Sequence, residues 1–154
     1  MTVQGDSRRG LPRKLVELLE ALKLVPDRSE RIQMLIGIAE RFRPVPPRVA
    51  SPPYPEEHRV PGCESQAYVW AEELPGGTLK FYFAVENPQG ISAKATSVIL
   101  DETLSGAPLE EVAAVPGEIV NEIFGGELSM GKSMGLMGIV SMVQSFARRK
   151  LGRA

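Results

Sequence analysis

The stretch QAYVWAEELPGGTLKFYFAV, residues 66–85, decides the fold class of this chain. Before the Pro-Gly-Gly turn at 75–77, Gln66, Tyr68 and Trp70 alternate with small or aliphatic residues, and after it large apolar residues alternate with Lys80, Tyr82 and Ala84. Two alternating segments joined by such a turn are typical of a β-hairpin. In the second strand the apolar face is formed by Leu79, Phe81, Phe83 and Val85. We expect this face to pack on helices.

Helices are predicted on both sides of the hairpin. Leucines with the i, i+3, i+4 and i+7 spacing of one helical face occur over 13–24. Asp27 and Glu30 resemble a capping box, and the helix after them has a predicted apolar face of Ile32, Leu35, Ile36 and Ala39. Further helices are expected over 92–104, 108–114, 118–124 and about 133–151. Grouped strands between groups of helices predict an α+β fold.

Size and composition narrow the classes of protein. At roughly 100–200 residues per domain, 154 residues predict one domain over 1–154, with 1–10 as a flexible tail. The net charge of −1 argues against a protein that coats nucleic acid. The polar start lacks the apolar core of a secretory signal, and the longest apolar stretch, 134–143, is too short to span a membrane. We expect a soluble, cytoplasmic protein that binds neither nucleic acid nor membrane.

Cysteine and histidine are scarce. Cys63 is the single cysteine and His58 the single histidine, so neither an intrachain disulfide nor a multi-cysteine metal site can form. A reducing compartment fits this composition best. We expect no cofactor and no metal.

A proline-rich segment leads to the cysteine. Seven of the thirteen prolines lie within 44–62, a run that can form neither a helix nor a central strand. Loops of this length inside a small domain are often functional. The segment ends on Val60-Pro61-Gly62-Cys63.

Several roles are open to Cys63. A thiol hydrolase would need a base, and His58 lies only five residues away with a prolyl turn between them. A redox sensor would usually have a resolving cysteine, and the chain has none. A carrier needs only one accessible nucleophile that accepts a group and gives it up again. A buried structural thiol or an adaptor without chemistry of its own are the remaining alternatives.

One segment of the chain matches a nucleotide-binding motif, and we interpret the match as accidental. GELSMGKS, residues 126–133, satisfies G-x-x-x-x-G-K-[ST], in which the lysine, here Lys132, would meet phosphates. Only 21 residues follow Ser133, too few for the further parallel strands that a nucleotide-binding domain needs. We predict instead a glycine-rich turn before the last helix, with Ser129 or Ser133 as its N-cap. Gly131, Gly135 and Gly138 indicate close contact with a neighbour.

The string RVPGCESQ, residues 59–66, between a proline-rich loop and an aromatic hairpin, resembles the SufE family of sulfur acceptors for cysteine desulfurases. The resemblance extends from about residue 12 to residue 151. Glu64 stands where the family usually has glutamine, and Lys132 stands in the position of a family arginine.

The resemblance implies a function and a fold. Cys63 would take persulfide sulfur from a PLP-dependent cysteine desulfurase and pass it to an iron–sulfur cluster scaffold. The protein would then be a sulfur-transfer partner rather than a stand-alone enzyme, as a monomer or a homodimer. The fold would be that of the NifU-like, U-type scaffolds, a small antiparallel sheet with helices packed on one side. Candidates for the partner-docking loop are His58, Arg59, Gly62, Glu64, Ser65, Gln66 and Lys132.

A reactive persulfide on a carrier gains from shelter between partners. We therefore expect Cys63 to be at least partly buried in the free protein. Gly62 is the natural hinge for an outward movement of the loop, since hinges are often small residues at loop ends. On this hypothesis Gly62→Val impairs sulfur transfer far more than it lowers thermal stability.

Overall fold

The predicted hairpin forms a two-stranded antiparallel sheet. β1 (Ala67–Glu73) pairs with β2 (Leu79–Val85), so that Ala67 lies opposite Val85. A computed structural model describes residues 10–152, and the predicted tail, apart from Gly10, lies outside the described residues. Gln66 is not part of the strand, because its φ of +54° turns the chain just before β1.

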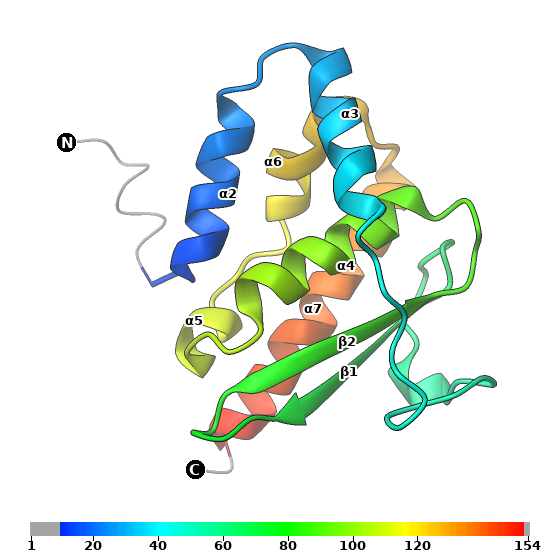
Figure 1. Ribbon diagram of the computed structural model, residues 1–154, viewed down its shortest axis with the longest axis vertical. Coiled ribbons are helices and arrows are strands. Elements are labelled where there is room, and N and C mark those ends of the chain that lie inside the picture. The colour runs from blue at the N-terminus through cyan, green and yellow to red at the C-terminus, as the bar shows by residue number, and fades with distance from the viewer. Residues whose placement is uncertain (1–9, 153–154) are drawn as a thin grey trace.

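Helices precede and follow the sheet in the order that the sequence predicts. Their bounds are α2 (Arg13–Lys23), α3 (Arg28–Ala39), α4 (Ile91–Leu104), α5 (Leu109–Ala113), α6 (Ile119–Phe124) and α7 (Met130–Gly152), with 3-10 turns at Glu56–His58 and Gly125–Glu127. As predicted, Asp27 caps α3 by accepting a hydrogen bond of 3.1 Å from the N–H of Glu30. Figure 1 shows α4 and α7 on one side of the two strands, which confirms the α+β architecture.

The main core lies between the sheet and the helices. Val69 of β1 and Phe81 and Phe83 of β2 point into it, as the alternation predicts. Leu100 of α4 and Ile139 of α7 meet them there, and both are fully buried. Removing each such side chain from water contributes about 1.5–3 kcal/mol to folding.

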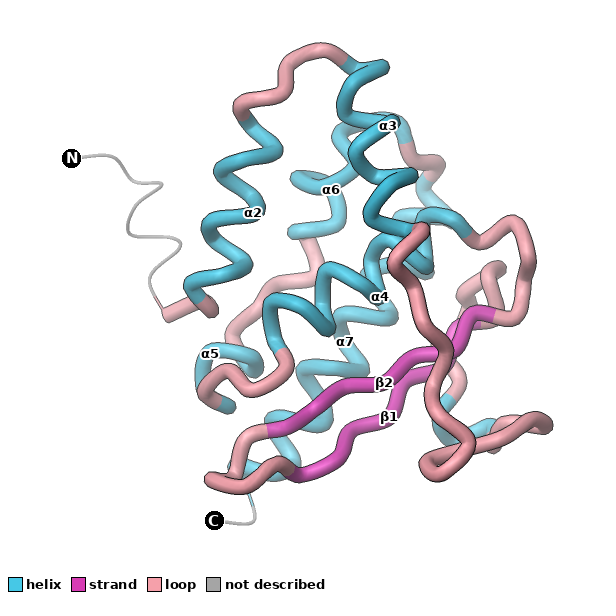
Figure 2. Tube along the Cα trace, in the orientation of Figure 1, coloured by secondary structure: helices cyan, strands magenta, loops and turns pink. Residues whose placement is uncertain are grey.

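The proline-rich segment covers the opposite face of the sheet, where Figure 2 shows it as a loop that crosses the strands. Tyr54 of this segment lies 5.1 Å, centroid to centroid, from both Tyr68 and Trp70. Arg48 donates two hydrogen bonds to Glu72, which lower the pKa of that carboxyl. The segment is therefore an extended but well-anchored covering.

The two ends of this segment also occupy the two edges of the sheet. At the edge of β2, the N–H of Val45 donates to the carbonyl of Phe83 over 2.8 Å. At the edge of β1, the N–H of Val60 donates to Ala67 over 2.8 Å, and Arg59 bridges to Tyr68. An isolated two-stranded sheet is marginal in water, so these bonds support both strands.

Two details differ from the predictions. Ile32 of α3 is 42% exposed, and the buried residues of α3 are Leu35, Ile38 and Ala39, because a groove remains open beside the first turns of this helix. α7 begins at Met130 rather than at about Ser133, because Ser129 already caps it. No helix in residues 10–152 is long and apolar enough to cross a membrane.

Candidate functional site

Cys63 ends a tight turn. The N–H of Cys63 donates to the carbonyl of Val60 over 3.4 Å, and between them Pro61 is followed by Gly62 at a φ of +70°. Proline in the second position and a positive φ in the third are the features of a type II turn. The carbonyl of Cys63 then accepts a hydrogen bond of 3.1 Å from Gln66, which closes a second turn. The backbone on both sides of the thiol is thus held by hydrogen bonds.

A glycine face of α7 receives this turn. Cys63 is only 6% exposed, which confirms the expected burial. A Cβ built on Gly135 would lie 3.2 Å from the Cα of Cys63 and 3.5 Å from its Sγ. A Cβ on Gly138 would lie 2.8 Å from Val60, whereas one on Gly131 would meet nothing within 4 Å. The predicted close contact is therefore confirmed for Gly135 and Gly138, and it is what allows the thiol to lie against the helix.

The connection between β2 and α4 holds the turn from another side. The carbonyl of Ser65, a buried residue, accepts a hydrogen bond of 3.2 Å from the N–H of Asn87. The side chain of Asn87 donates to the carbonyl of Glu64 over 3.4 Å. A Cβ on Gly90 would lie 3.2 Å from that of Ser65. Glu64 and Gln66 are exposed, so polar residues surround a buried sulfur.

His58 is occupied elsewhere. Its Nδ1 lies 2.9 Å from the carbonyl oxygen of Val69, which requires a proton on that nitrogen. Its ring stacks on Trp70 with centroids 5.1 Å apart. Arg59 forms an ion pair with Glu56 at 3.6 Å. Both side chains thus take part in the covering of β1 rather than in activation of the thiol.

On the carrier hypothesis, we predict that His58→Ala changes sulfur uptake by Cys63 less than about 10-fold, because a carrier can use the groups of its partner for proton transfer. Thermal stability should fall instead, by about 1–2 kcal/mol, since a hydrogen bond and a ring contact are lost. Uptake kinetics and thermal denaturation measure the two effects. A loss of several orders of magnitude in a variant with an unchanged far-UV spectrum would restore the hydrolase hypothesis.

Lys132 lies in the first turn of α7, exposed to solvent. Its backbone N–H donates to Oγ of Ser129 over 3.2 Å, so Ser129 is the predicted cap. The P-loop interpretation is excluded, because the motif follows α6 rather than a strand and its last four residues are already helical. Gly135, rather than Lys132, makes the close approach to Cys63.

The role of Gly62 can be separated into backbone conformation and space. A Cβ here would meet nothing within 4 Å, but the positive φ disfavours most side chains. We predict that Gly62→Asn retains stability to within about 1 kcal/mol, because asparagine tolerates this conformation. Gly62→Val should cost about 2 kcal/mol. Thermal denaturation of both variants tests this, and equal stability of the two would contradict it.

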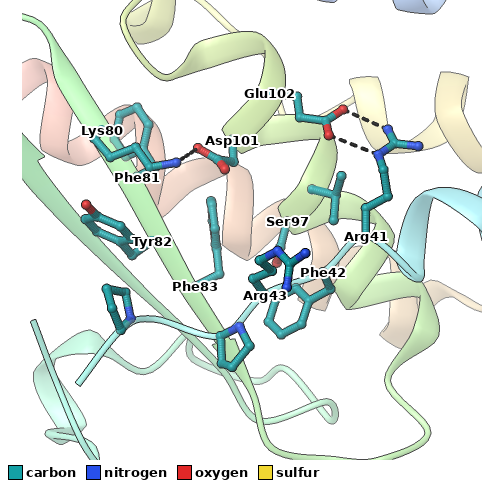
Figure 3. Close-up of a pocket in the computed structure, with 13 residues that line it drawn as sticks. Arg41, Phe42, Arg43, Lys80, Phe81, Tyr82, Phe83, Ser97, Asp101 and Glu102 are labelled. Carbon is teal, nitrogen blue, oxygen red and sulfur yellow. Dashed lines mark hydrogen bonds and ion pairs between the residues drawn. The ribbon is translucent and has the colours of Figure 1, made fainter. Parts of the chain in front are cut away.

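A cavity lined by charged and aromatic side chains lies away from Cys63. It has a volume of about 440 Å³ and lies between β2, α4 and the chain that follows α3 (Figure 3). Arg41 makes two hydrogen bonds to Glu102, of 2.8 and 3.0 Å, and Lys80 lies 2.6 Å from Asp101. None of the predicted site residues lines this cavity. Its ion pairs join α4 to β2 and to the end of α3.

No group of three or more His, Cys, Asp or Glu side chains that could hold a metal ion occurs in residues 10–152. The buried sulfur with its exposed polar surroundings forms the candidate site.

Comparisons with known proteins identify the family of this chain. Residues 16–147 match the sequence model of the SufE family, described as the Fe-S metabolism associated domain. A protein of Plasmodium vivax named "Cysteine desulfuration protein SufE" is 28% identical over 136 residues, which are 88% of this chain and 52% of the relative. The chain thus spans about half the length of that curated relative.

A solved structure is also similar. It is the solution structure of a hypothetical protein from Thermus thermophilus, with 28% sequence identity and a TM-score of 0.70 over 92% of this chain and 98% of the other. The family match covers most of the residues that form the core and all of those around Cys63. This chain is a member of the SufE family.

Proposed function

We propose that the protein is a sulfur carrier. Cys63 accepts persulfide sulfur from a PLP-dependent cysteine desulfurase and delivers it to an iron–sulfur cluster scaffold. The observation that carries the proposal is the placement of the single thiol, buried on Gly135 of α7 at a turn whose other residues are largely exposed.

The transfer needs no outside oxidant or reductant. The Cys63 thiolate attacks the outer sulfur of the persulfide on the desulfurase cysteine. A sulfur–sulfur bond forms on Cys63 while the sulfur–sulfur bond on the desulfurase breaks, and the desulfurase cysteine leaves as a thiolate. The proton that Cys63 loses when it forms the thiolate is matched by the proton that the leaving thiolate of the desulfurase takes up. A second transfer of the same form passes the sulfur to the scaffold.

Burial of Cys63 supports carriage rather than free reactivity. Oxidation and exchange at sulfur depend on access, so a sheltered persulfide survives longer between partners. The hydrolase alternative lacks support, because the proton of His58 Nδ1 faces Val69 and its ring is stacked on Trp70. Glu64, Gln66 and Lys132 are exposed and are the side chains that a partner would meet first.

The experiment is mass spectrometry of the intact protein after incubation with a cysteine desulfurase and cysteine. An added mass of about 32 Da is expected, the mass of one sulfur atom, and fragmentation should place it on Cys63. An adaptor that only activates the desulfurase would raise the turnover of cysteine without acquiring the added sulfur. That result would overturn the proposal.

A further inference from the structure

An apolar groove lies between α3, the start of α4 and the end of α6. Its volume is about 180 Å³, and six of its lining residues are Ile32, Leu35, Ile36, Ile91, Phe124 and Leu128. Ile32 and Ile91 are 42% and 49% exposed. Small-molecule sites usually measure about 300–1,000 Å³ and carry a few placed polar groups, so this groove suits an apolar protein segment better.

The groove reaches the start of α4, close to the Cys63 site. Ile91 directly follows Gly90, and a Cβ on Gly90 would touch Ser65, two residues from Cys63. Figure 1 shows α3 beside this end of α4. A partner that reaches Cys63 therefore comes within reach of Ile91.

The start of α7 adds a second apolar connection. Leu128 lines the groove, and α7 begins two residues later with Met130, which is 80% exposed. Met134 is 62% exposed and precedes Gly135, the residue against Cys63. Methionine is common at surfaces that adapt to a partner, because its unbranched side chain can repack. Clusters of exposed apolar side chains of this kind mark interaction sites.

We propose that this groove receives an apolar segment of the cysteine desulfurase, as a docking contact separate from the chemistry at Cys63. The inference rests on the proposed function, because it takes the sulfur donor as the partner that approaches Cys63. The closeness of the groove to Cys63 selects this occupant over a second copy of the chain, because Ile91 lies at the Cys63 end of the groove and the exposed Met134 precedes Gly135. Because the residues that line the groove are mostly apolar, the segment that binds there should also be apolar.

The test uses the full chain and a purified cysteine desulfurase supplied with cysteine. Ile32→Glu and Ile91→Glu place a charge in the groove at half-exposed positions, so both variants should fold. Leu24→Glu is the matched control, because Leu24 follows α2, is 82% exposed and does not line the groove. Calorimetric titration gives the Kd, and loading kinetics over a range of carrier concentrations give the KM and kcat of sulfur transfer.

We expect the two groove variants to raise the Kd and the KM about 10-fold or more, as for apolar anchors at an interface centre, with kcat within about 2-fold of wild type. Leu24→Glu should stay within about 2-fold in all three quantities. If both groove variants kept the wild-type Kd and KM and Cys63 were still loaded with sulfur, the inference that the groove is a docking site would be overturned, while the proposed function would stand. A change confined to self-association, measured by sedimentation, would assign the groove to a second copy and also overturn the inference. Failure of wild-type Cys63 to take up any sulfur would overturn both proposals.

Discussion

Replacing Cys63 by alanine is expected to lower sulfur uptake by about three orders of magnitude or more, to the background of the assay. The reason is that the nucleophile itself is removed and the chain has no second cysteine to replace it. The protein should remain folded, since loss of one buried sulfur costs only about 1–2 kcal/mol. Intact mass and transfer of ³⁵S from labelled cysteine measure the loss.

The serine variant provides the control for shape. Serine keeps the size of the side chain but buries a hydroxyl beside Gly135, which costs about 1–3 kcal/mol when no partner is present. Cys63→Ser should therefore be as inactive as Cys63→Ala, and it should be less stable than Cys63→Ala in thermal denaturation. Appreciable uptake by either variant would show that another atom accepts the sulfur.

Replacing Gly135 by valine should release Cys63 from its shelter. Because even a Cβ would stand 3.2 Å from the Cα of Cys63, the further methyl groups of valine leave no space for the turn. We expect labelling of Cys63 by a bulky maleimide to accelerate about 10-fold or more, with a loss of about 1–3 kcal/mol in stability from overpacking. A persulfide on Cys63 should also be lost faster to small thiols.

Gly131 supplies the matched control within the same helix. A Cβ there meets nothing within 4 Å, so Gly131→Ala should leave labelling unchanged and slightly raise stability, through helix propensity. Gly135→Ala should give a labelling rate and a stability between those of Gly131→Ala and Gly135→Val. If Gly135→Val labelled as slowly as wild type while remaining folded, the contact with α7 would not be what shelters the thiol. If Cys63 of the wild-type protein reacted with the maleimide as fast as a small-molecule thiol, the burial of Cys63 itself would be contradicted.

The fold could be predicted where the information is local. Alternation over residues 67–73 and 79–85 describes the two faces of each strand, and the Asp27 cap depends on residues three positions apart. Periodicity places Ile32 on the apolar face of its helix, because it shows which residues share a face. Periodicity does not show how far the neighbouring helix extends to cover that face. The opening beside Ile32 depends on where α6 ends and where α4 begins.

The site could be predicted only as far as Cys63 and its neighbours in the sequence. His58 is close to Cys63 along the chain, yet its Nδ1 bonds to Val69, because the edge of β1 presents a free carbonyl there. The glycines of α7 indicate a close contact, but they do not show which residues of the chain make it. Which turn lies on Gly135 is a long-range pairing that no local pattern encodes.

The bonds along the edge of β1 limit how far the cysteine turn can move. Strand edges with unpaired N–H and C=O groups are templates on which other chains add strands and aggregate. Val60 closes this edge at Ala67, and the carbonyl of Gln66 is held by Glu86. An outward swing confined to residues 61–65 would deliver the sulfur and leave the edge closed. A larger swing would break the bond between Val60 and Ala67 and expose an unpaired edge of β1, on which another chain can add a strand.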